Sequence, residues 1–137
     1  MLINIEDFSL AWRWISASHG NFPKNTLDKL NPLSEDQARA LIATTPINFP
    51  VGAKRLDSTE GNELTRQWLI SLVNDSQKVT ICWDQETALT LPWLVFCDHW
   101  DDFCYPSSND INLYLKSGEL FLRWNHYEVF EFDSSAM

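Results

Sequence analysis

The sequence predicts a single α+β domain over residues 1–137, in which N-terminal helices pack on one face of a C-terminal, mostly antiparallel sheet of about four to five strands. Two patterns support this prediction. Apolar residues recur at helical spacing in roughly the first 75 residues, whereas from Lys78 onward they alternate with a period of two. The length of 137 residues suits one domain. An apolar content of 45% is sufficient for a core and excludes a disordered chain.

Three helices are predicted in the first half of the chain. The first has a stripe of apolar residues at helical spacing, namely Ile5, Phe8, Trp12 and Ile15. The second begins at Ser34, because Ser34 and Gln37 have the spacing of a capping box, and it ends before Pro46. The third covers residues 62–74, although Leu69, Ile70 and Val73 make this segment apolar nearly all round, so that a strand is also possible. The segments between these helices contain prolines and are predicted to be loops, at residues 21–33 and 46–58.

The second half of the chain is predicted to form the sheet. Alternation of Val79, Ile81 and Trp83 predicts the first strand, and residues 84–89 are expected to form a short helical turn. Residues 92–97 are rich in aromatic and branched side chains and predict a central strand. Three more strands complete a meander, at residues 109–116, 119–124 and 127–132.

The acidic composition excludes several kinds of partner. The formal net charge is −9 and the sequence pI is near 4.6. Since nucleic-acid affinity comes largely from Lys and Arg, we expect no binding to nucleic acid. Negative charge also disfavours anionic lipid surfaces, and no apolar run has the length of a membrane span, so we expect no membrane association. The first 60 residues carry a formal charge of −1 and the remainder −8.

Other features predict a cytoplasmic protein without a cofactor. The N-terminus lacks the basic region and long apolar stretch of a signal peptide. The chain has three cysteines, an odd number that does not suit a framework of disulfides. Its four glycines are isolated, so the sequence has no glycine-rich loop that would cradle a phosphate.

The densest polar cluster is Cys97-Asp98-His99-Trp100-Asp101-Asp102-Phe103-Cys104, which is predicted to form a loop after the central strand. Carboxylate, imidazole and thiol groups are metal ligands, but the spacing here matches no established zinc or calcium pattern. The ordinary alternative is a pair of buried cysteines beside a loop of solvated aspartates. We therefore predict no metal ligands.

A second polar cluster, Asn125-His126-Tyr127-Glu128, lies at the turn before the last strand. If this turn shares a sheet edge with the Asp98–Asp102 loop, His126 or Glu128 would lie within hydrogen-bonding reach of an aspartate, which suits proton transfer. Alternatively, the histidine satisfies local backbone groups and Glu128 pairs with Arg123. A metal-dependent or acid–base enzyme using both segments is the second functional hypothesis, and whether the chain is an enzyme stays open.

The first functional hypothesis is protein binding. Aromatic residues reach 13% and many fall on or beside the predicted sheet. If helices cover one face only, rings and carboxylates on the other face would suit a basic protein partner or a second copy of the chain. The alternative is that most rings fill the core. The predicted binding residues are Asp98, His99, Trp100, Asp101, Asp102, Tyr105, Trp124, His126, Tyr127 and Glu128.

Two C-terminal segments carry a resemblance to a small family of bacterial proteins of unknown function. They are residues 93–108, WLVFCDHWDDFCYPSS, and residues 124–132, WNHYEVFEF. The resemblance implies a bacterial cytoplasmic origin and assigns no activity, ligand or catalytic residue. In outline the chain also resembles the small acidic immunity proteins that neutralise bacterial toxins, although it matches none of their diagnostic motifs.

Overall fold

The computed structural model describes residues 5, 8–10, 14, 22–44, 54–72, 77–84, 86–104, 111–115, 120–125 and 127–133. Most of the first predicted helix lies outside these residues. So do residues 116–119, where two of the predicted strands meet, and two predicted binding residues, Tyr105 and His126.

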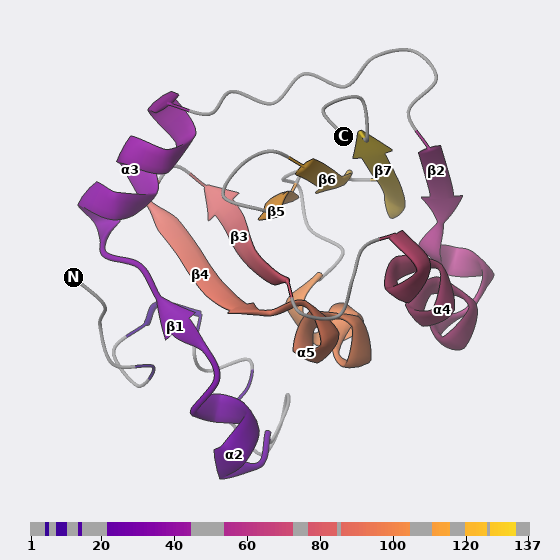
Figure 1. Ribbon diagram of the computed structural model, residues 1–137, viewed down its shortest axis with the longest axis horizontal. Helices are drawn as coiled ribbons and strands as arrows, with labels where there is room; N and C mark the ends of the chain where they lie inside the picture. Colours follow the sequence, from indigo (N-terminus) through magenta and orange to yellow (C-terminus); the bar gives the residue numbers. More distant parts are fainter. Residues whose placement is uncertain are drawn as a thin grey trace.

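The structure has the predicted α+β class, but its sheet is larger than predicted. In the described part of the chain, seven strands form one antiparallel sheet in the order β1-β4-β3-β5-β6-β7-β2 (Figure 1). The strands are β1 (Asn31–Pro32), β2 (Lys54–Asp57), β3 (Lys78–Asp84), β4 (Thr87–Pro92), β5 (Ile111–Leu115), β6 (Leu120–Trp124) and β7 (Val129–Asp133).

The additional strands lie in segments predicted to be loop or helical turn. Strands β1 and β2 are the two edges of the sheet, where short strands with proline or charged residues are common. They are too short for an alternating pattern to be recognised. Strand β4 replaces the helical turn predicted at residues 84–89. Asp84 still accepts a hydrogen bond from the backbone N of Glu86 (2.8 Å), but it does so in the β3–β4 hairpin.

Two of the predicted helices are confirmed by the structure. Helix α3 (Glu35–Thr44) starts at the predicted capping box, in which Gln37 N donates to Ser34 Oγ (3.2 Å) and Ser34 N donates to Gln37 Oε1 (3.0 Å). Helix α4 (Asn62–Leu72) follows the 3-10 turn η2 (Ser58–Glu60). The other helices described in full are short: α2 (Lys24–Leu27), α5 (Trp93–Asp98) and α6 (Trp100–Phe103).

The prediction of a central strand at residues 92–97 is wrong, because this segment forms α5. Pro92 ends β4 and precedes the first helical residue. Trp93, Phe96 and Cys97 are buried, and their spacing of three and four residues places them on one side of a helix. A short apolar run fits a buried strand or a buried helix equally well, so composition alone does not distinguish them.

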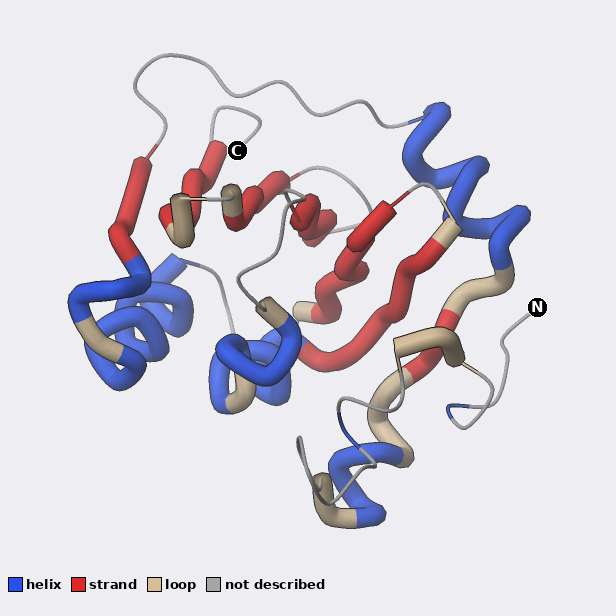
Figure 2. The backbone as a smooth tube through the Cα atoms, turned by 180° about the vertical axis from the view of Figure 1, so that it is seen from behind, coloured by secondary structure: helices blue, strands red, loops and turns tan. Residues whose placement is uncertain are grey.

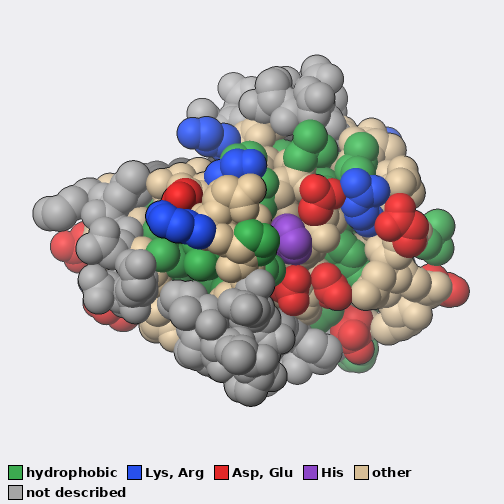
Figure 3. All heavy atoms as spheres, turned by 90° about the horizontal axis from the view of Figure 1, so that it is seen from below, with side chains coloured by type: hydrophobic (Ala, Val, Ile, Leu, Met, Phe, Trp, Pro, Cys, Tyr) green, Lys and Arg blue, Asp and Glu red, His purple; other side chains and the backbone are tan. Residues whose placement is uncertain are grey.

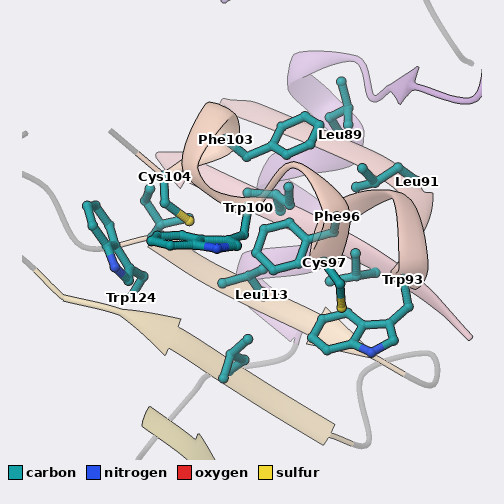
Figure 4. Packing of buried hydrophobic residues seen from close by; sticks show 14 of the residues in the cluster. Leu89, Leu91, Trp93, Phe96, Cys97, Trp100, Phe103, Cys104, Leu113 and Trp124 are labelled. Atoms are coloured by element: carbon teal, nitrogen blue, oxygen red, sulfur yellow. The ribbon is translucent and has the colours of Figure 1, made fainter. Parts of the chain in front are cut away.

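The first face of the sheet carries the main core. One row of residues runs directly across the strands and is almost fully buried: Leu89, Ile81, Leu113, Leu122 and Phe132. Residues of α5 and α6 pack on this face, and Figure 4 shows Phe96 and Trp100 over Leu113 of β5. The core therefore lies between the sheet and these two short helices.

The helices lie on both faces of the sheet, not on one face as predicted. Ala38 of α3 packs with Cys82 and Ala88, whose side chains alternate onto the second face. Figure 2 shows strands of the sheet between α3 and the other long helix, α4. Small residues on β3 and β4 allow α3 to approach closely. Farther along the same row, toward β2, the residues become Arg123, Glu131 and Arg55.

Candidate binding surface

Helices α5 and α6 carry the predicted polar cluster across the first face of the sheet. The backbone N of Trp93 donates to Gln77 O (2.9 Å), just before β3 begins. The indole of Trp83, near the end of β3, donates to Phe103 O (3.0 Å). Residues 98–102, predicted to be a loop, are therefore the end of α5 and much of α6.

Three indole N–H groups hold the backbone beneath this cluster. The pairs are Trp14 with Asp102 O (3.0 Å), Trp83 with Phe103 O (3.0 Å) and Trp100 with Asn62 O (3.2 Å). The first two carbonyls belong to the last residues of α6, where the helix itself provides no N–H donor for them. Buried indoles thus fix α6 and the start of α4 from inside the protein.

The charged side chains of this cluster have different environments. Asp98 is exposed and accepts from Nε of Arg66 (2.8 Å), with Nη2 also at 2.8 Å. Asp101 is exposed and accepts from Nδ2 of Asn62 (3.0 Å). Asp102 is half-buried, and its Oδ2 lies 3.6 Å from Nδ1 of His99. Burial, and then the negative charge of Asp101, raise the pKa of Asp102.

The second predicted cluster forms a tight turn between β6 and β7. Glu128 N donates to Asn125 O (2.8 Å), and Asn125 N donates to Val129 O (3.0 Å). The side-chain Oδ1 of Asn125 accepts from the backbone N of Tyr127 (2.9 Å) and of Val129 (3.3 Å). Glu128 has a φ of 63°, in the left-handed region that glycine and asparagine adopt more easily.

This β6–β7 turn is anchored from both faces of the sheet. On the first face, Ser58 donates through N (2.9 Å) and Oγ (2.5 Å) to Glu128 O, and its Oγ accepts from Trp124 Nε1 (3.1 Å). Toward the second face, Nδ2 of Asn125 donates to Oε1 of Glu131 (3.2 Å). The turn is therefore held by hydrogen bonds on both faces of the sheet despite its exposure.

Glu131 is a buried carboxylate between two arginines. Its Oε1 accepts from Nε (3.1 Å) and Nη2 (2.9 Å) of Arg123, and its Oε2 accepts from Nε of Arg55 (3.2 Å), whose Nη2 is at 3.1 Å. Burial acts to raise the pKa of Glu131, but these hydrogen bonds and charges outweigh it, so the pKa is lowered. Arg123 pairs with Glu131, whereas the sequence suggested Glu128.

Residues 58–62 join the two predicted clusters. Ser58 binds Glu128 on one side, while Asn62 binds Asp101 and Trp100 on the other. Within the described residues, Glu128 makes no hydrogen bond with the aspartates of α5 and α6. The contact with an aspartate that was considered for proton transfer is therefore not made by Glu128, and for His126 it lies outside the described residues.

The prediction of an aromatic sheet surface is wrong for most of its rings. Trp100 and Trp124 are 6% and 1% exposed, and their indoles belong to the core. Other core rings are Trp93, Phe96, Phe103, Phe130 and Phe132. Aromatic rings contribute most to stability when they are buried, and in this small domain they make up much of the hydrophobic core. Tyr127, by contrast, is 74% exposed.

The cysteines show no sign of reactivity. Cys82, Cys97 and Cys104 are buried and form no disulfide with one another. Burial raises the pKa of Cys82 and of Cys97 to about 12, so both are protonated at neutral pH and are poor nucleophiles. In the described part of the chain, His, Cys, Asp and Glu side chains form no group of three or more suited to a metal ion.

Together with neighbouring residues, the two clusters form an acidic surface. We define it as Asp57, Glu60, Glu63, Asp98, Asp101 and Glu128, of which all but Glu128 are exposed. Figure 3 shows acidic side chains gathered beside a histidine, with a basic side chain between two of them. Arg66, which bonds to Asp98 and Glu63, lies within this surface.

Sequence reasoning missed the contribution of residues 57–63. A local signal was present, since Asp57 and Glu60 have the spacing of a capping box. In the structure Asp57 is the N-cap of η2, and its side chain accepts a hydrogen bond from the backbone N of Thr59 (2.9 Å). What the sequence did not indicate is the position of η2 between the β6–β7 turn and α6.

The comparisons with known proteins add no assignment. No protein-family model matches the chain, and neither the curated proteins nor the solved structures contain a significant match. The resemblance to a bacterial family therefore stays a prediction. In the described part of the chain, no helix has the length and apolar character needed to cross a membrane.

Proposed function

We propose that this protein is a protein-binding module that engages a basic partner through the acidic surface. The observation that carries this proposal is the rigid mounting of exposed carboxylates. Asp101 projects from α6, whose backbone carbonyls accept hydrogen bonds from the indoles of Trp14 and Trp83. Asp98 is the last residue of α5, in which the amide of Trp93 donates to Gln77 O, and Glu128 belongs to a turn held by Ser58. A preorganised surface loses little conformational entropy on binding.

The distribution of charge supports a basic partner. Carboxylates of η2, α4, α5, α6 and the β6–β7 turn are brought together, and Arg66 offsets only part of their charge. A concentrated field of one sign accelerates encounter with a molecule of opposite sign and disfavours acidic competitors. The most specific version of this proposal is that the protein neutralises a cationic toxin, as small acidic immunity proteins do.

Acid–base catalysis is the alternative proposal, and one observation favours it. Nδ1 of His99 lies 3.6 Å from Oδ2 of Asp102, and both side chains are about one-third exposed. A carboxylate beside an imidazole can orient it for proton transfer. However, the thiols of Cys82 and Cys97 are protonated and buried, so they do not supply a nucleophile for this pair.

Affinity capture from an extract of the native cells, at low and high salt, tests the binding proposal. The test variant combines Glu60→Gln, Glu63→Gln and Asp101→Asn. The matched control, Glu35→Gln with Asp36→Asn and Glu86→Gln, removes the same charge beside α3. We expect the wild type and the control to retain the same partner at low salt and release it at high salt. Retention by the test variant, or recovery of no partner by any form, would contradict the proposal.

A further inference from the structure

We draw no further inference here: the strongest candidate, the outer edge of strand β2 (Lys54–Asp57) at the end of the sheet, carries nothing because nothing in the described part of the chain shows what covers it.

Discussion

Replacing Glu131 by glutamine should destabilise the protein and change how its stability depends on pH. The carboxylate is 7% exposed and accepts hydrogen bonds from Arg55, Arg123 and Asn125. Removing one partner of a buried ion pair costs about 3–5 kcal/mol. Arg55 and Arg123 are 47% and 32% exposed, so water can solvate their guanidinium groups when the carboxylate is removed. We therefore expect Glu131→Gln to lower the unfolding free energy by about 2–3 kcal/mol at pH 7.

The pH dependence has a defined sign. The pKa of Glu131 is lowered in the folded protein. A carboxylate of this kind stabilises the fold above its unfolded pKa of about 4.3, and the contribution disappears as the pH falls through the folded value. The difference in stability between the wild type and Glu131→Gln should therefore be full at pH 7 and shrink below about pH 4.3.

Urea unfolding followed by tryptophan fluorescence measures this difference at each pH. Glu63→Gln is the control, because Glu63 is 73% exposed and its replacement should cost less than about 0.5 kcal/mol. The reasoning about Glu131 is refuted if Glu131→Gln costs no more than this control, or if its cost is the same at pH 7 and pH 3.

Three further predictions concern stability and reactivity. Glu128→Gly should raise the unfolding free energy by about 0.5–1 kcal/mol, because glycine adopts the left-handed conformation at lower cost. Glu128→Ala keeps a Cβ and should not raise the unfolding free energy. Equal changes of the two variants in thermal unfolding would contradict this prediction. Trp83→Phe should lower the unfolding free energy by about 2–3 kcal/mol, because Phe103 O loses its buried hydrogen-bond donor and a small cavity forms. An unchanged midpoint of urea unfolding would contradict this prediction. The buried thiols of Cys82 and Cys97 should react with a disulfide reagent at pH 7 only as fast as the protein opens, and rapid labelling without denaturant would exclude their burial.

Much of the secondary structure was predictable where the pattern is local. The capping box at Ser34 and Gln37 fixed the start of α3, since both hydrogen bonds join residues three apart. Strand β3 and the last three strands followed from period-two alternation, because one face is buried along their length. In such segments a few neighbouring residues contain the information that determines the structure.

For the candidate site, the sequence singled out polar clusters at residues 98–102 and 125–128, and the structure places Asp98, Asp101 and Tyr127 of these clusters at the surface. It did not indicate that η2 separates them, or that Trp100 and Trp124 belong to the core. Whether a ring is exposed depends on what covers it, and here the covering segments are distant in the chain.

By itself, the sequence determined the α+β class, the acidic character, the start of α3 and the burial of one face of the later strands. Only the tertiary structure decided that residues 93–98 form a helix, that Lys54–Asp57 pairs with β7, and that Glu131 lies between two arginines. The physical reason is the range of the interactions. Capping and alternation act between near neighbours, whereas edge pairing, packing of a buried helix and the ion pair of Glu131 with Arg55 depend on partners tens of residues away.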